Sequence, residues 1–459
     1  MSSAGNVPEA STVWNGGATP ARKGTAPESL VLTNKIAGVP ILGVRNVVAL
    51  IGLLALFLSS PPSVARADDG GLKAPGSAMV VPSLREVIAL SRSVAPEVVT
   101  GETAVLIAQS GIVGARRSPL GNPYLEVVGE RGTSGTWGNT SVIGTLWLPL
   151  EIGGQRSGRI AEVNASVELY RQNLELMRHL AAAEATRAYG MAVVGRERAH
   201  LLEELVEFAR SEAALYEGRY RGGDATLRDT RLAAVELGRY GVLLSEAKAD
   251  IVAALSELGR LTNVAYTAPP NGGLHPPPLD VTAGDADDAP GLKVTRAEAR
   301  YFERTKERLR REGSSGAFSA MAVGGRGEFG EGRVGAGVAY AFPVLQRNQG
   351  EQARAEAERT RALTEEKLKR RLYRMRIAGL VEELAQVRNA VEQLDEDAEP
   401  AAVATLEAST EMQRAGKSDL FAILTSRRDL ALLRFRRIEL AAREWNIQSE
   451  LVAITGRTP

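Results

Sequence analysis

The hydrophobic pattern along the chain predicts long helices interrupted by two short pairs of strands. From about residue 157 to 218 there is no proline, and apolar residues recur at helical spacing, as in Val167, Leu174, Met177, Ala181 and Ala188. A helix of about 60 residues would be about 90 Å long at 1.5 Å per residue. Because many of its apolar residues are small, we expect coiled-coil-like packing against other helices.

A second helix is predicted to return from this rod, to about residue 262. Gly222 and Gly223 can end the rod because glycine readily adopts the left-handed conformation of a helix C-terminus. Asp224 or Thr226 can then cap the returning helix. The same arrangement is expected from 350 to 456, with a break near Pro400, where a proline must end or kink a helix, and a turn at Gly416.

Two stretches alternate like strands and predict β-hairpins at about 123–148 and about 315–342. In the second hairpin, one set of alternate positions holds Val334, Ala336, Val338, Tyr340 and Phe342, which are mostly large and apolar. The positions between them hold only Gly and Ala. One face would then carry large apolar side chains, and the other face would carry almost no side chain beyond a methyl group. A barrel wall with lipid on its outside explains this pattern. A buried sheet edge is the alternative.

The two halves of the chain match in register. Gly416 follows Gly223 by 193 positions, as Arg414 follows Arg221. We therefore expect a tandem duplication, with a first repeat at 68–264, a Pro/Gly-rich extended linker at 265–293 and a second repeat at 294–459. A capping box at Ser83 begins a helix that pauses near Pro96 and resumes to about 117. A helix near 295–311 opens the second repeat.

Residues 1–67 are interpreted as a leader with a secretory signal peptide. The apolar run at 47–58 is too short to span a bilayer, basic residues precede it, and Ala65 and Ala67 provide a cleavage pattern. An uncleaved membrane anchor is the alternative for this segment. Residues 1–44 form an unusually long leader, for which a misassigned start codon is a second explanation.

Composition and charge exclude several classes of function. Lys+Arg 56 against Asp+Glu 55 provides no basic face for nucleic acid. Cysteine is absent, which excludes disulfides, thiolate catalysis and a lipid-modified cysteine. His179 and His200 are too far apart on one rod to share a metal, and His275 lies in the linker. Without a nucleophile elbow or a P-loop, we predict no enzyme, no cofactor and no metal site.

Several of these segments together resemble the TolC-type outer-membrane efflux channels. They are residues 84–90, 95–97 and 122–125, the turns at 221–223 and 414–416, and the ending at 424–456. Residues 150–161 and 342–351 resemble more narrowly the heavy-metal branch of that family, the cobalt-zinc-cadmium type.

The resemblance implies a mainly α fold with a transmembrane β-barrel. Three copies would build one 12-strand barrel in outer-membrane lipid and an α-helical tunnel in the periplasm, and four strands could not close a barrel alone. It implies a passive conduit for heavy-metal cations, supplied by an inner-membrane pump of the resistance-nodulation-division type through a periplasmic adaptor. Alternatives are a channel for drug efflux or type I protein secretion, a periplasmic adaptor, or a structural coiled-coil protein.

The resemblance also suggests residues for these roles. The adaptor would dock at the turns, through Arg221, Gly222, Gly223, Arg414, Ala415 and Gly416; the alternative is ordinary helix-end chemistry. Asp229 and Asp419 could form an acidic ring at the entrance, although Ala422 and Thr425 are not acidic, and solvated helix-face charges are the alternative. The aromatic residues expected at the membrane interface are Tyr124, Trp137, Trp147, Tyr340 and Phe342, with isolated packing as the alternative.

Overall fold

The computed structural model describes residues 79–131, 140–415 and 420–459. The chain divides into two units, Met1–Lys73 and Ala74–Pro459, and all described residues belong to the second. The leader and signal peptide therefore lie outside the described residues, as do Trp137, Gly416 and Asp419.

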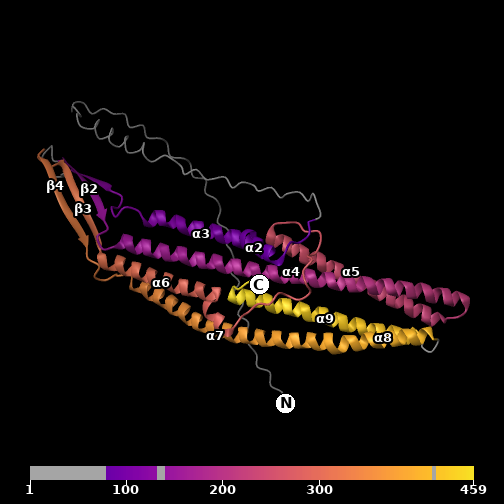
Figure 1. Ribbon diagram of the computed structural model, residues 1–459. Coiled ribbons are helices and arrows are strands. Elements are labelled where there is room, and N and C mark those ends of the chain that lie inside the picture. The colour runs from indigo at the N-terminus through magenta and orange to yellow at the C-terminus, as the bar shows by residue number, and fades with distance from the viewer. Residues whose placement is uncertain (1–78, 132–139, 416–419) are drawn as a thin grey trace, which may run out of the picture. The chain divides into compact units, whose positions relative to one another are not determined.

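The first half of the described unit contains a broken helix, a β-hairpin and a long helical hairpin (Figure 1). Its elements are α2 (Leu84–Val94), α3 (Pro96–Ala115), β1 (Tyr124–Arg131), β2 (Thr140–Leu150), α4 (Gln155–Gly222) and α5 (Leu227–Thr262). The backbone N–H and hydroxyl of Ser83 both donate to the Glu86 carboxylate, at 3.0 and 2.9 Å, so α2 begins where the capping box predicts. Leu84–Ala115 has the length and apolar composition of a membrane span, but Ala95 and Pro96 divide it.

The second half repeats the order of helix, β-hairpin and helical hairpin, with a 3₁₀ turn and a π-helical turn in addition. Its elements are a 3₁₀ turn (Ala283–Asp288), α6 (Pro290–Ser315), β3 (Ala317–Arg326), β4 (Gly332–Ala341), α7 (Gln349–Gln393), a π-helical turn (Leu394–Ala398), α8 (Glu399–Arg414) and α9 (Leu420–Thr455). The π turn lies where the break was predicted. Pro400 falls in the first turn of α8, where its missing N–H is not needed. The mainly helical fold with two β-hairpins is confirmed.

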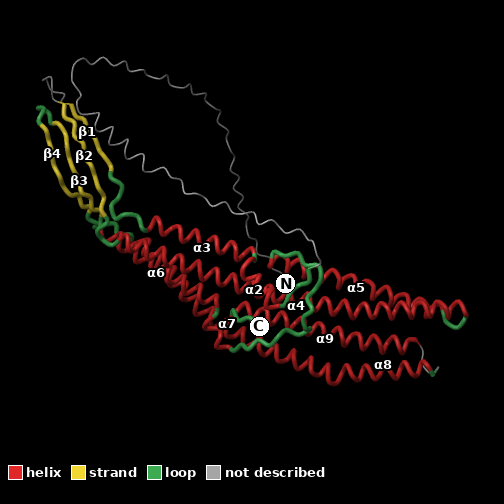
Figure 2. Tube along the Cα trace, turned by 45° about the horizontal axis from the view of Figure 1, so that its top comes forward, coloured by secondary structure: helices red, strands yellow, loops and turns green. Residues whose placement is uncertain are grey.

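Small residues pack the long helices together, as the sequence predicts. A run of alanines on α4 is buried, including Ala182, Ala185 and Ala192, and α4 contacts α3, α5, α6 and α9. The closest approach is at Gly190, where an added Cβ would lie 2.3 Å from the Trp445 ring of α9. Figures 1 and 2 show α4 and α5 side by side, with α9 and α8 as a second pair.

The linker between the two halves is not simply extended, because it contains a 3₁₀ turn and α6 already begins at Pro290. It is also fastened to the helices. Trp445 Nε1 donates to the Leu274 carbonyl at 2.8 Å, and Gln448 Nε2 donates to the Pro277 carbonyl at 2.8 Å. Between them His275 Nδ1 lies 2.8 Å from a buried Glu444 carboxylate oxygen. These contacts hold the linker against α9.

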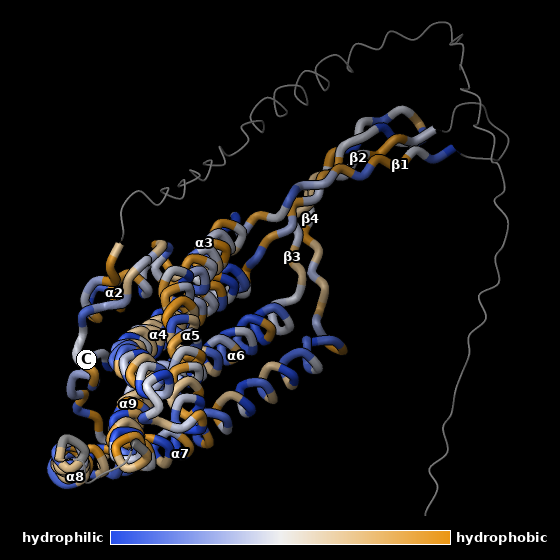
Figure 3. The backbone as a smooth tube through the Cα atoms, turned by 90° about the vertical axis from the view of Figure 1, so that its right-hand side faces the viewer, coloured by the Kyte–Doolittle hydropathy of each residue, from blue (hydrophilic) through white to orange (hydrophobic). Residues whose placement is uncertain are grey.

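The four strands form one antiparallel sheet in the order β1-β2-β3-β4. The two hairpins join through β2 and β3, where Val142 pairs with Arg326 and Leu150 with Phe318. β2 continues through Pro149 to Leu150, two residues past the predicted end, and the Pro149 carbonyl accepts a hydrogen bond from the Gly121 N–H at 2.7 Å. The sheet lies at one end of the helices, with helices covering neither face (Figure 3).

Candidate functional site

The turn between α4 and α5 is built by one glycine and one capping box. Gly223 has a φ of 84°, and its N–H donates to the Tyr220 carbonyl at 3.1 Å. Thr226, rather than Asp224, is the N-cap of α5: its hydroxyl accepts from the Asp229 N–H at 3.2 Å. The Asp229 carboxylate in turn accepts from the Thr226 N–H and hydroxyl, at 3.2 and 2.6 Å.

Asp229 therefore has a local role in the helix cap. The hydroxyl and N–H of Thr226 lower the pKa of its carboxyl by hydrogen-bonding to the charged form. A place in an acidic entrance ring stays a prediction for this residue. Its suggested companion, Asp419, lies outside the described residues.

The tip of this turn is open to contact by another molecule. Arg221 is exposed, and among the described residues its one ion pair is with Glu217 of its own helix, at 3.0 Å. A Cβ added at Gly222 would meet nothing nearer than the Asp224 carboxylate, at 3.7 Å. Tyr220 and Leu227 are also exposed there. Sequence reasoning missed these two, although an apolar residue beside a glycine turn is a detectable signal.

The turn between α8 and α9 has a similar surface where it is described. Arg414 is the last residue of α8, and the Ala415 N–H donates to the Glu411 carbonyl at 3.0 Å. Met412 and Phe421, on either side of the turn, are exposed. Figures 1 and 2 show both helical-hairpin ends at the end of the helices opposite the sheet. An exposed aromatic or apolar side chain beside arginine is typical of protein interfaces.

One face of the sheet carries only apolar side chains and glycine, apart from the hydroxyl of Tyr340. From the strand register, this apolar face consists of Leu125, Val127, Gly129, Val142, Gly144, Leu146, Leu148, Leu150, Phe318, Ala320, Ala322, Gly324, Val334, Ala336, Val338 and Tyr340. Val334 is 95% exposed and Val338 68% exposed. From residue 142 to 150 the face extends about 27 Å at about 3.4 Å per residue, close to the roughly 25 Å apolar band of membrane barrels.

Charged or polar residues lie at the loop end of the apolar face and are interspersed on the opposite face. At the loop end, the apolar face terminates at Arg131, Thr140 and Arg326. The opposite face is mixed. It carries small residues, large apolar residues such as Val128, Ile143 and Met321, and the polar residues Glu126, Glu130, Ser141, Thr145, Ser319 and Arg333. The concentration of apolar residues on one face agrees with the alternation predicted for the second hairpin. The first hairpin shows the same pattern.

The aromatic residues divide between the two faces. Tyr340 and Phe342 meet edge to face at 4.8 Å, and Phe318, missed from sequence, lies 6.5 Å from Tyr340. This aromatic cluster ends the apolar face on the helix side. Tyr124 and Trp147 instead stack at 5.9 Å on the mixed face, where Trp147 Nε1 donates to Glu126 at 3.2 Å. They therefore do not share a surface with the other pair.

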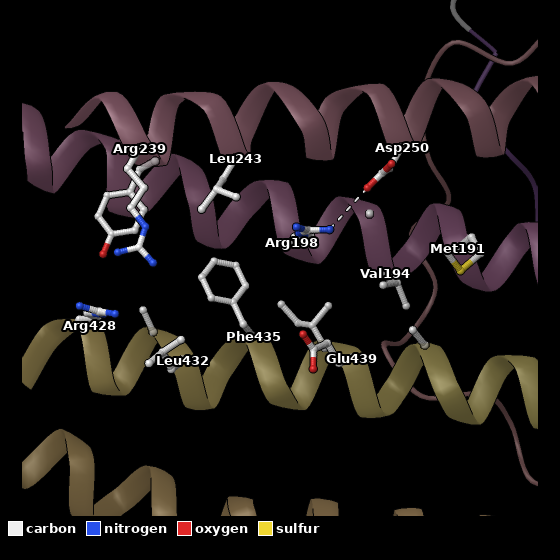
Figure 4. Close-up of a pocket in the computed structure, with 15 residues that line it drawn as sticks. Met191, Val194, Arg198, Arg239, Leu243, Asp250, Arg428, Leu432, Phe435 and Glu439 are labelled. Carbon is white, nitrogen blue, oxygen red and sulfur yellow. Dashed lines mark ion pairs between the residues drawn. The ribbon is translucent and has the colours of Figure 1, made fainter. Parts of the chain in front are cut away.

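A groove of about 360 Å³ lies between α4, α5 and α9 (Figure 4). Its floor is apolar, with Leu243 and Phe435 facing each other, and Arg198 at its rim pairs with Asp250 at 3.5 Å. No nucleophile with an adjacent base lines it. Among the described residues, no three His, Asp or Glu side chains come together as a metal-binding group.

The sequence is similar to two metal-resistance proteins. No family model matches the sequence. The cobalt-zinc-cadmium resistance protein CzcC of Cupriavidus metallidurans is 24% identical over 434 residues, covering 89% of this chain and 98% of that protein. The nickel-cobalt-cadmium resistance protein NccC of Alcaligenes xylosoxydans xylosoxydans is 26% identical over 239 residues, 50% of this chain and 54% of that protein.

The fold is also found among solved structures. The outer membrane channel CmeC of Campylobacter jejuni matches with a TM-score of 0.67 and 14% identity, over 87% of this chain and 94% of that one. A sheet of two hairpins continuing into two long helical hairpins is thus shared with a known channel. In sequence, along nearly its whole length, this protein is similar to CzcC, and in fold it is similar to outer-membrane channels of the TolC type.

Proposed function

We propose that three copies of this chain form an outer-membrane channel of a tripartite efflux system. The observation that carries this proposal is the open sheet with its uncovered apolar face. β1 and β4 each have an unpaired edge, and unpaired backbone groups in lipid are costly by several kcal/mol each. Because the strands alternate in direction, β4 of one copy can pair antiparallel with β1 of the next. Three copies would close a 12-strand barrel with the apolar face toward lipid.

The helices support an oligomer as well. Leu106, Ile107 and Val113 of α3 are exposed, and Val113 is 78% exposed. An apolar helix surface of this kind is typical of a contact with another protein surface. Two long helical hairpins from each of three copies would form the wall of a periplasmic tunnel, and their ends would lie farthest from the membrane.

The proposed partners meet the channel at those ends. A periplasmic adaptor would contact Arg221, Gly222 and Gly223, together with the turn at 414–416, and would connect the channel to an inner-membrane pump. The exposed Tyr220 and Phe421 add apolar contact area beside the basic residues. We propose heavy-metal cations as the exported solutes, because the chain is similar to CzcC and NccC, whose names state metal resistance.

Deleting the gene in its own host should lower tolerance to cobalt, zinc or cadmium, and the intact gene should restore it. The protein should fractionate with the outer membrane, need detergent for release and run as a trimer that heat dissociates. Sensitivity to drugs with unchanged metal tolerance would favour the drug-efflux alternative. Release without detergent as a monomer would contradict the channel and favour a periplasmic adaptor or coiled-coil protein.

Replacing Gly222 with leucine should abolish metal tolerance without reducing the amount of trimer in the membrane. Position 222 has room for a side chain and an ordinary φ, so the helix end should survive, while the added bulk blocks a partner's approach. Gly218→Leu is the matched control, one turn earlier on the same helix, exposed and with nothing within 4 Å of an added Cβ. If Gly222→Leu retains tolerance equal to Gly218→Leu, the glycines serve only to end the helix.

A further inference from the structure

The two loops that connect the sheet to the long helices are exposed and apolar. We call them the junction loops: residues 151–154 between β2 and α4, and residues 342–348 between β4 and α7. Ile152 is exposed in the first, and Phe342, Val344 and Leu345 are exposed in the second. Leu345 is 86% exposed, so no described residue of this copy covers it. A run of uncovered apolar side chains at equivalent places in both halves indicates a contact surface.

Both junction loops have arginines beside their apolar residues. Arg156 follows the first loop and donates from Nε to the Arg117 carbonyl at 3.1 Å and from a terminal nitrogen to the Arg116 carbonyl at 3.3 Å. Arg347, in the second loop, donates from Nε to the Pro343 carbonyl at 2.7 Å. These bonds fix the side chains while leaving positive charge at the surface.

The positive charge of these arginines is not balanced locally. Arg116, Arg156 and Arg347 form no ion pair with any residue that the structure describes. The one acid within the junction loops, Glu151, is occupied by Arg159 through two hydrogen bonds of 2.7 and 2.9 Å. The surface thus combines uncovered apolar side chains with arginines that lack a carboxylate partner.

The junction loops directly continue the apolar face of the sheet. Phe342 touches the ring of Tyr340, and Leu150, two residues before Ile152, pairs with Phe318. If the apolar face lies in hydrocarbon, these loops fall at the depth where acyl chains end and phosphates begin. There, aromatic and apolar side chains sit beside arginines whose stems lie along the apolar region and whose charged ends reach the headgroups.

We propose that the junction loops insert into the phospholipid leaflet on the helix side of the barrel. Val344 and Leu345 enter the acyl region, and Arg116, Arg156 and Arg347 bind lipid phosphates. The inference rests on the proposed function, since it requires that the apolar face of the sheet contacts lipid. A phospholipid supplies both an apolar and an anionic group a few ångströms apart, which is the pairing that these loops present. If a neighbouring copy covered Leu345 instead, that copy would have to supply both an apolar and an anionic group.

The absence of cysteine allows a direct test by site-directed spin labelling, because one introduced thiol is the only label site. Leu345→Cys would be labelled in the full trimer, reconstituted in vesicles of phosphatidylethanolamine and phosphatidylglycerol. Val338→Cys, on the apolar face, is the lipid control, and Glu207→Cys, exposed on α4, is the water control. We expect the ratio of oxygen to water-soluble nickel-chelate accessibility at 345 to exceed that at 207 several-fold and to indicate a shallower depth than at 338.

Two results at 345 would overturn the inference while leaving the channel intact. Nickel accessibility equal to that at 207 would place the loop in water, and exclusion of both reagents would place it in a contact between copies. If the label at 338 also fails to report lipid, the proposed barrel itself is wrong. A second variant, Arg347→Glu with the label at 345, should make that label shallower, because the reversed charge repels phosphate; an unchanged depth would remove the arginine from the proposal.

Discussion

Val338→Lys should prevent stable membrane insertion of most of the protein, whereas Ala339→Lys should leave insertion largely intact. Val338 lies within the apolar face, one row from its middle, paired with Ala320. Ala339 is the next residue along β4 and belongs to the mixed face, paired with Ser319. A lysine facing lipid near the bilayer midplane costs roughly 2–4 kcal/mol, and the cost would occur once in every copy of the proposed trimer.

The heat-dissociable trimer recovered from the outer membrane measures this difference directly. The two variants introduce the same residue at neighbouring positions of the same strand, so the added charge and the net charge are matched. Equal trimer levels for Val338→Lys and Ala339→Lys would mean that the face does not meet lipid. A loss for Ala339→Lys alone would reverse the assignment of the two faces.

Trp445→Ala should destabilise the helical region more than any exposed substitution on the same helix. The Trp445 side chain is 1% exposed and lies against the backbone of Gly190, with the Tyr189 ring 5.8 Å away. Truncating a buried aromatic residue to alanine costs about 3–5 kcal/mol. The Leu274 carbonyl would also lose its indole donor, which loosens the linker on α9.

The measurement is the midpoint of thermal loss of helical circular dichroism for the trimer in detergent. With an unfolding entropy of about 2.1 cal/mol/K per residue, we expect a decrease of roughly 5 °C. Leu432→Ala truncates a half-exposed apolar side chain on the same helix and should shift the midpoint far less. Equal shifts for the two variants would show that the contact between Trp445 and Gly190 does not hold the two helical hairpins together.

Local periodicity explains why much of this fold is predictable. The alternation in 332–341, the proline-free rod and the cap at Ser83 are each encoded within a few residues, since strands repeat every two residues and helices every 3.6. The helix ends at Gly222 and Gly223 follow from the conformational freedom of glycine. Such signals need no knowledge of distant partners, so the elements agree within a few residues.

The candidate sites were predictable only where one element contains the whole signal. The turn at 219–227 was recognised, but its exposed Tyr220 and Leu227 were missed because exposure depends on neighbouring helices. Asp229 was identified as an acid near the entrance, and only the structure shows that Thr226 engages it. From sequence, the junction loops could only be recognised as similar to a known family. Only the structure shows that Leu345 is exposed.

The sequence by itself determined the identity, order and approximate length of the helices and strands, and the presence of one apolar face in the second hairpin. Only the tertiary structure decided how the two hairpins share that face. Alternation defines two sides for each hairpin, but pairing between β2 and β3, more than 160 residues apart, decides which sides coincide. That pairing puts Tyr124 and Trp147 on the mixed face with Glu126, away from Tyr340 and Phe342. The register decides this because a shift of one residue would exchange the side chains between the two faces.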